Sequence, residues 1–302
     1  MEAPQHDSKG RPIFRDIIDP NSAVIRQKLI KEIEAEIRSP LIIYTANIGN
    51  PASGIMIQDA ALMEDLLRTV HNEKKGTLML TSGGGDPNAA EKLMQMFRKR
   101  FTESFQIIVP FFAKSAATFM CLGSDKICMG YGAELGPIDP QIQIAPNVWI
   151  PARAYIDGLE EIRGKVLAGD PISLYYGMIQ QIKPEYITIC SNAIEESRST
   201  AEKWLKQYML RENPEQAEKV ADWLSDGKTY KSHGKPIDFH EAQTTLKLNV
   251  DEINNESDLW QKIWELFLRS TQYLQVSNSV KLFESTTNSL SMFFQPAPPE
   301  QK

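Results

Sequence analysis

Four continuous runs of apolar residues divide the first half of the chain. They cover residues 41–46, 76–82, 105–112 and 125–130, and stretches of helical character lie between them. Runs that are apolar throughout, without polar alternation, are typical of parallel strands that helices cover on both faces. The alternation of strands and helices therefore predicts an α/β fold built from βαβ units.

Helical patterns flank this alternation on both sides. Residues 1–20 are polar and predict an arm, after which apolar side chains recur on one helical face until Pro40. Near the other end, residues 257–275 form a strongly amphipathic helix ahead of a segment rich in Ser, Thr and Asn. The apolar face of that helix must pack against something, and the pattern leaves open whether this is its own domain or a neighbouring subunit.

The stretch between these regions is mostly helical. Residues 151–225 have a helical pattern with breaks at Pro171 and Pro184. Residues 232–250 then predict a turn, a short helix and a terminal strand. The chain contains no internal repeat, so we expect one α/β pattern with helical additions.

The composition of the chain argues against a nucleic-acid partner and against a membrane span. The chain has 302 residues, 42% of them hydrophobic, and a formal net charge of −6. This acidic balance argues against a nucleic-acid partner, which usually needs a basic face. No window approaches the roughly 18 uninterrupted apolar residues of a membrane span, and the first residues lack the apolar run of a secretory signal. We therefore expect a cytoplasmic protein.

The three cysteines are too few and too irregularly spaced for a disulfide framework. Cys121 and Cys128 do not have the spacing of a zinc site either, and no histidine lies close by in the sequence. We expect the cysteines to be reduced core residues, which fits a reducing compartment. The pattern indicates no metal and no cofactor.

The segment T-S-G-G-G-D, residues 81–86, follows directly after the second predicted strand. Consecutive glycines let a backbone take positive φ angles and turn its N–H groups toward a ligand. A tight strand-to-helix connection with no ligand would use the same residues. A phosphate loop fits less well, because G-x-x-x-x-G-K-[ST] is absent and Asp86 would repel phosphate.

Ser115 stands where the third predicted strand stops and a short apolar helix begins. Its side chain either caps that helix or lies beside the free N–H groups of the helix N-terminus, which stabilise a developing oxyanion. The serine and the glycine segment both follow parallel strands, where open α/β sheets place their ligand sites. The N–H groups of Gly84 or Gly85 and of Ala116 would then face one carbonyl oxygen beside Ser115.

These segments carry a resemblance to a known family. T-S-G-G-G-D, followed by A-K-S-A-A-T, L-G-S-D-K-I-C-M-G and E-L-G-P-I-D-P, resembles the Clp-protease and signal-peptide peptidase A superfamily. The downstream S-H-G-x-P-I segment fits as well. Within the superfamily the chain is most similar to the bacterial serine dehydrogenase proteinases, soluble relatives of signal-peptide peptidase A, over residues 25–250.

The resemblance implies a Clp/crotonase-like spiral of ββα units that assembles into a homo-oligomer. It implies hydrolysis of peptides or unfolded protein segments through an acyl-enzyme on Ser115, with the glycine loop as oxyanion hole. On this interpretation residues 1–40 form an N-terminal arm and helix, and residues 41–250 form the catalytic domain. Residues 251–302 form a C-terminal helical extension that is a candidate for oligomerisation.

The residue that removes the serine proton is left open. Clp proteases carry a histidine shortly after the nucleophile, whereas the comparable segment here offers Asp139; we interpret Asp86 and Asp139 as turn or cap residues. Signal-peptide peptidase A relatives use a downstream lysine. Lys165 is the best placed in separation, provided that burial lowers its pKa. Lys183 has more apolar neighbours, and His233 lies near the position where Clp proteases carry their triad acid.

Two other functions share this pattern. A crotonase-type acyl-CoA enzyme would use the oxyanion hole for a thioester enolate with carboxylate bases, and it has no need for Ser115. A catalytically silent scaffold or adaptor would keep the fold for assembly, and the open identity of the base leaves room for it. Dependence of activity on Ser115 separates the first from a hydrolase, and dependence on a base separates the second.

Overall fold

The computed structural model describes residues 22–70, 73–145 and 148–293. The chain divides into two units. Unit 1 consists of Met1–Leu135 with Asp238–Lys302, and unit 2 is Gly136–Ile237. The predicted arm over residues 1–20 lies outside the described residues.

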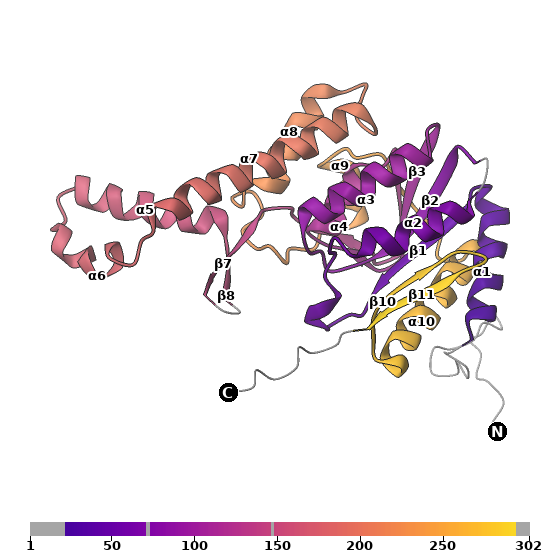
Figure 1. Cartoon of the computed structure of the whole chain (residues 1–302). Helices are drawn as coiled ribbons and strands as arrows, with labels where there is room; N and C mark the ends of the chain where they lie inside the picture. Colours follow the sequence, from indigo (N-terminus) through magenta and orange to yellow (C-terminus); the bar gives the residue numbers. More distant parts are fainter. Residues whose placement is uncertain (1–21, 71–72, 146–147, 294–302) are drawn as a thin grey trace, which may run out of the picture. The chain divides into compact units, whose positions relative to one another are not determined.

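Unit 1 is built on a seven-stranded sheet with the order β11-β10-β1-β2-β3-β5-β9 (Figure 1). Its five parallel strands are β1 (Leu41–Ala46), β2 (Lys75–Thr81), β3 (Ser104–Val109), β5 (Lys126–Met129) and β9 (Val250–Glu252). The last two run antiparallel to their neighbours, and they are β10 (Ser279–Glu284) and β11 (Ser289–Phe293). The predicted α/β class is confirmed, and β1, β2, β3 and β5 begin within one residue of the runs that predicted them.

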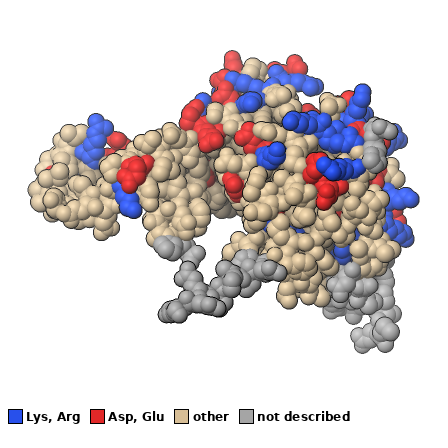
Figure 2. All heavy atoms as spheres, viewed as in Figure 1, with Lys and Arg blue, Asp and Glu red and all other residues tan. Residues whose placement is uncertain are grey.

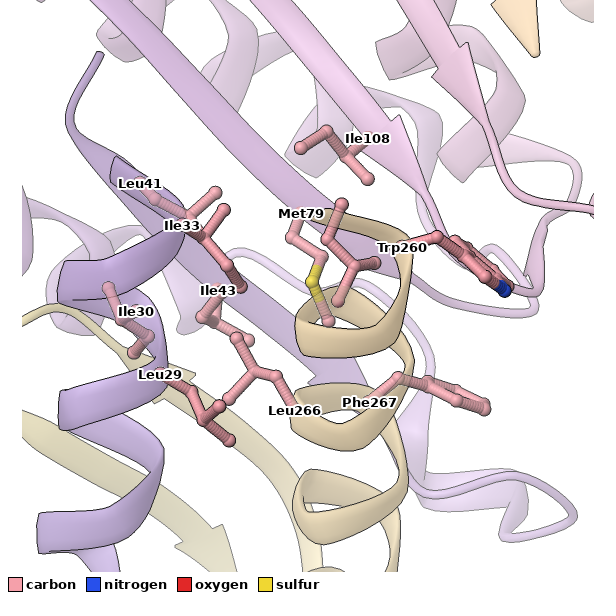
Figure 3. Packing of buried hydrophobic residues seen from close by; sticks show 11 residues of the cluster. Leu29, Ile30, Ile33, Leu41, Ile43, Met79, Ile108, Trp260, Leu266 and Phe267 are labelled. Carbon is pink, nitrogen blue, oxygen red and sulfur yellow. The ribbon is translucent and has the colours of Figure 1, made fainter. Parts of the chain in front are cut away.

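One face of the sheet is covered by α1 (Ala23–Ile37) and α10 (Asp258–Ser277). Figure 3 shows the apolar side chains that these two helices pack over β1, β2 and β3. They are Leu29, Ile30 and Ile33 of α1, Leu41 and Ile43 of β1, Met79 of β2, Ile108 of β3, and Trp260, Ile263, Leu266 and Phe267 of α10. The amphipathic helix near the end of the chain therefore packs within its own unit, which answers the question its pattern left open.

The other face carries α2 (Asp59–Thr69), α3 (Pro87–Arg100) and α4 (Ala116–Leu122) (Figure 1). Phe97 of α3 stacks on Phe105 of β3 with ring centroids 4.9 Å apart. All seven residues of α4 are buried, and the helix packs against α3. Covering both faces in this way explains why β1 is buried along its whole length and β2 from Gly76 onward.

Strands β10 and β11 were not predicted from the sequence. All six residues of β10 are buried, including Lys281 and Glu284, which the sequence pattern suggests should face water. Each finds a charged partner from a distant segment: Lys281 Nζ lies 2.6 Å from Asp59 Oδ1, and Glu284 accepts a 2.8 Å bond from Arg26 Nε. Buried charges are tolerated when they are paired in this way.

Unit 2 begins with an antiparallel pair of strands, β7 (Gln141–Ala145) and β8 (Val148–Pro151). It continues through α5 (Ala152–Leu167), η3 (Ile172–Tyr175), α6 (Tyr176–Ile179), α7 (Pro184–Gln207) and α8 (Pro214–Ser225). The breaks predicted at Pro171 and Pro184 are both present: Pro171 directly precedes η3, and Pro184 is the first residue of α7. The core of this unit lies between the end of α7 and α8, where Trp204, Leu205, Val220 and Leu224 are buried.

The remaining elements are short. They are η2 (Pro51–Ser53), β4 (Phe112–Ala113), β6 (Glu134–Leu135) and α9 (Phe239–Thr244). Strands β4 and β6 pair in parallel and form a small sheet of their own beside the main one. Across the described ranges, no helix has the length and apolar character that crossing a membrane requires.

Candidate active site

Ser115 occupies a sharp turn between β4 and α4. Its backbone has φ 51° and ψ −121°, a conformation that a residue with a Cβ adopts only at a cost. Its side chain makes no capping hydrogen bond to α4. The N-cap interpretation of this serine is therefore wrong. The strained turn instead presents the hydroxyl beside the start of a helix, as the nucleophile turn of α/β-hydrolases does.

The glycine loop lies directly against this turn. Gly84 has φ 105°, and a Cβ on it would lie 2.6 Å from Ser115 Cβ and 3.1 Å from Ala116 N. Gly85 has φ 148°, and a Cβ there would lie 2.3 Å from Ile55 N. Real Cβ atoms do not approach so closely, so both positions require glycine for close backbone contact as well as for positive φ.

Two N–H groups beside Ser115 are free to bind a ligand. Gly84 N–H donates to Ser82 Oγ at 3.1 Å and is therefore occupied. In the described part of the chain, neither Gly85 N–H nor Ala116 N–H has a hydrogen-bond partner. Ala116 is the first residue of α4, so its N–H also lies at the positive end of the helix dipole. Of the two predicted glycine donors, the geometry favours Gly85.

Backbone bonds hold the loop and the serine turn together. Ser82 N–H donates to Phe112 O at 3.3 Å, and Lys114 N–H donates to Ser82 O at 3.0 Å. Within the turn, Thr118 Oγ1 donates to Ala113 O at 2.6 Å. The side chain of Lys114 points to β6, where Nζ donates to Leu135 O at 2.9 Å. Ser115 and its two donors thus rest on a frame of short strands in unit 1.

The two candidate lysines are both exposed in unit 2. Lys165 Nζ lies 2.7 Å from Glu161 Oε1, and this hydrogen bond raises the pKa of Lys165 above its ordinary value. A lysine base needs the opposite shift, because only the neutral amine accepts a proton. Lys183 begins α7, with Nζ 5.3 Å from the centre of the Tyr186 ring. Within unit 2, neither lysine has the buried surroundings that the prediction required.

The third candidate, His233, is paired with a carboxylate. Its Nδ1 lies 2.7 Å from Oδ1 of Asp139, which is 94 residues away along the chain. The Asp139 side chain is 4% exposed and also accepts a 3.0 Å bond from Gln141 Nε2, whereas the His233 ring is 29% exposed. A half-buried imidazole held by a buried carboxylate at Nδ1 is the arrangement of a general base with its orienting acid.

The prediction that the two aspartates are turn or cap residues is confirmed for Asp86. Asp86 caps α3 by accepting from Asn88 N–H at 2.9 Å. Asp139 is not a solvated turn residue, because it is buried and bonded to His233. The sequence contains no local signal that pairs two residues 94 positions apart. Among the residues described, no group of three or more His, Cys, Asp or Glu is placed to hold a metal ion.

Comparison with known proteins places this geometry in a family. Residues 21–290 match the model of the ClpP-like SDH-type serine proteinases. The chain is 27% identical over 197 residues to the uncharacterized protein MJ0137 of Methanocaldococcus jannaschii, covering 65% of this chain and 60% of that protein. It is 22% identical over 215 residues to MJ1495 of the same organism, covering 70% and 62%. The chain thus spans less than two thirds of the length of either relative.

Two solved structures are similar, both at 16% identity. They are a serine-to-alanine mutant of the 1510-N membrane-bound stomatin-specific protease, and a lysine-to-alanine mutant of that protease in complex with a substrate peptide. The first has a TM-score of 0.41 and covers 69% of this chain and 79% of that one. The second has a TM-score of 0.43 and covers 80% and 84%.

Proposed function

The chain belongs to the ClpP-like SDH-type serine proteinase family, and from this premise we propose that it hydrolyses peptide bonds through an acyl-enzyme on Ser115. The observation that carries the proposal is the strained turn at Ser115, with φ 51° and ψ −121°, beside two N–H groups without partners. Strain of this kind persists only where the surrounding structure enforces it, and it concentrates at active sites. A crotonase-type acyl-CoA enzyme has no need for this residue in this conformation.

The first half of the reaction forms the acyl-enzyme. Ser115 Oγ attacks the carbonyl carbon of the substrate while its proton passes to a base. The carbonyl oxygen becomes an oxyanion, which accepts hydrogen bonds from Gly85 N–H and Ala116 N–H. The C–N bond then breaks, and the base returns the proton to the leaving amine. In the second half, water attacks the ester, gives its proton to the base and releases the new carboxylate, while Ser115 regains its proton.

We assign the proton transfer to His233. When Asp139 accepts a hydrogen bond from Nδ1–H, the lone pair of the ring lies on Nε2 and can take a proton from a hydroxyl. Asp139 is buried and close, so it holds the ring in one orientation and stabilises the imidazolium that forms. Lys165 remains the alternative base, with a hydrogen bond to Glu161 that opposes the role.

We also propose a homo-oligomer in the cytoplasm that acts on peptides or unfolded protein segments. Support for association comes from unit 2, where α5 buries only Ala152 and α6 buries nothing. Leu167 and Leu174 are 77% and 68% exposed, and Figure 2 shows few charged side chains at that end of the unit. Exposed apolar side chains grouped on one surface are typical of sites where proteins associate, and this supports the proposed homo-oligomer. The three cysteines are unpaired, which supports a reducing compartment.

The test is hydrolysis of a fluorescently labelled unfolded protein by three forms of the chain. Wild type and Ser199→Ala should release fluorescence at equal rates, because Ser199 is exposed on α7 and bonds only to Glu196 O. Ser115→Ala should lose all measurable turnover while keeping its thermal stability. Equal turnover by Ser115→Ala would overturn the proposal, and no turnover by any form would favour the scaffold alternative.

A further inference from the structure

Asp59 and Lys281 form an ion pair that is fully enclosed in unit 1. Their side chains have no exposed surface, and Lys281 Nζ lies 2.6 Å from Asp59 Oδ1. Tyr44 OH donates to the other carboxylate oxygen, Oδ2, at 2.7 Å. Taking both charges out of water costs free energy that an apolar pair of similar volume would not cost. The pair therefore calls for an explanation other than stability.

The same carboxylate reaches the backbone ahead of α2. Oδ2 of Asp59 accepts the N–H of Met56 at 3.0 Å. The preceding residue, Ile55, pairs with the glycine loop through two bonds: Ile55 N–H donates to Gly84 O at 2.8 Å, and Asp86 N–H donates to Ile55 O at 2.9 Å. Gly85, which carries the free N–H, lies between these two bonds. Hydrogen bonds and the peptide link between Ile55 and Met56 therefore connect the buried ion pair to the two neighbours of the oxyanion donor.

We propose that Asp59 is a positioning residue for the oxyanion loop and that Lys281 is the counter-charge of its carboxylate in the core; this rests on the proposed function of Ser115. Three consecutive glycines have the largest conformational freedom of any tripeptide. An oxyanion donor must nevertheless lie within a few tenths of an ångström of its place. The loop cannot fix itself, so neighbouring residues must fix it.

The place of Asp59 in the fold suits this role. Tyr44 belongs to β1 and Lys281 to β10, two neighbouring strands within the sheet. Asp59 accepts one hydrogen bond from each of these strands and a third from the backbone N–H of Met56. The carboxylate therefore links the backbone of Met56 to both strands. An apolar residue at position 59 would pack in the same space without accepting the Met56 N–H. Through these bonds the sheet restrains the segment at Ile55 and Met56, which in turn bonds to the glycine loop.

Two double variants separate positioning from stability. Asp59→Asn/Lys281→Met and Asp59→Leu/Lys281→Met both remove the ion pair, but only the asparagine variant keeps an oxygen that accepts the Met56 N–H. Both are compared with wild type by melting temperature and by the rate at which excess fluorophosphonate labels Ser115. We expect the asparagine variant to label within about threefold of wild type and the leucine variant at least about tenfold more slowly, since losing one oxyanion donor costs about 10²–10³ in rate.

Hydrogen exchange supplies a readout that needs no chemistry at Ser115. The Asp86 N–H, which bonds to Ile55 O, should exchange faster in the leucine variant and at the wild-type rate in the asparagine variant. If the leucine variant does not fold, Asp59→Ala/Lys281→Met takes its place. Equal loop exchange in the two double variants would overturn the inference. Absence of labelling in wild type would count against the proposed function instead, while the exchange rates would still decide the role of Asp59.

Discussion

The two units differ most in how their charged and helical residues are packed. In unit 1, α4 buries all seven of its residues, and the pairs Lys281–Asp59 and Arg26–Glu284 are enclosed. In unit 2, α5 buries one residue of sixteen, and its ion pairs, such as Lys165–Glu161, are exposed. The proposed nucleophile and oxyanion donors, which need fixed positions, lie in the densely packed unit. The proposed base lies in the looser unit, where a single buried carboxylate orients it.

The difference shows that the proposed nucleophile and the proposed base are held in place in different ways. Ser115 and the glycine loop are held by the sheet, through backbone bonds and close packing. His233 is held by one 2.7 Å contact with Asp139. Changes to buried, tightly packed residues of unit 1 should therefore affect folding and activity together, whereas in unit 2 activity should depend on His233 and on Asp139, which orients it.

The largest effect is expected from Asp139→Asn in unit 2. Removing the carboxylate while keeping the shape leaves His233 without its orienting acceptor. The same change in the serine-protease triad lowers kcat by about 10⁴, and we expect a loss of that order in peptide hydrolysis. Asp157→Asn, an exposed aspartate on α5, is the matched control and should leave kcat unchanged. Full activity of Asp139→Asn would remove His233 from the mechanism and return Lys165 and Lys183 to consideration.

A smaller loss is expected from Gly84→Ala in unit 1. The added Cβ would lie 2.6 Å from Ser115 Cβ at a backbone φ of 105°, so the loop or the serine turn must move. We expect a fall of about 10²–10³ in kcat, the cost of a displaced oxyanion donor. Gly132→Ala is the control, because Gly132 also has positive φ, 78°, but no atom lies within 4 Å of its Cβ position. Similar kinetics for the two variants would show that the close approach at Gly84 has no catalytic role.

Lys281→Met should affect stability more than any single replacement of a charged residue in unit 2. It leaves Asp59 buried without its counter-charge, which costs about 3–5 kcal/mol in the free energy of unfolding. Urea denaturation followed by tryptophan fluorescence measures this loss. A change within experimental error would mean that water reaches Asp59, and the contrast between buried and exposed charges would no longer hold.

The smallest effect is expected from Lys165→Met. The amine is exposed, and its partner Glu161 lies on the same helix and raises the pKa of Lys165, so the residue is protonated and solvated near neutral pH. Peptide hydrolysis should proceed at the wild-type rate across the pH range of activity. A hundredfold loss with intact folding would instead identify Lys165 as the base and contradict the assignment of His233.

The parts of the fold that local pattern determines could be predicted from the sequence. The apolar runs of β1 and β2 and the strand-to-helix change at Ser115 are visible in short windows. Strand β10 could not be found in this way, because Lys281 and Glu284 look solvated until Asp59 and Arg26, 222 and 258 residues away, neutralise them. Packing between distant segments outweighs local preference at such positions.

The candidate site also has parts that local sequence predicts and parts that depend on contacts between distant segments. Ser115, Ala116 and a glycine donor at either Gly84 or Gly85 follow from motifs at the ends of successive strands, and the structure favours Gly85 because Gly84 N–H bonds to Ser82 Oγ. The pairing of His233 with Asp139 depends on a contact across 94 residues, so the sequence left three bases open. The restraint of Gly85 by Asp59 depends on the sheet topology, which no short window contains. Short sequence motifs therefore predict the candidate nucleophile and oxyanion donors, but they do not predict the distant residues that hold the site in place.

The most direct test of the central claim is the intact mass of the protein after treatment with a fluorophosphonate probe. Wild type should gain the mass of one adduct, and Ser115→Ala should gain none, because only a serine that loses its proton to a base during attack, beside an oxyanion hole, reacts at a useful rate. An unmodified wild-type protein that is folded, or an adduct that persists in Ser115→Ala, would contradict the assignment of Ser115 as an activated nucleophile.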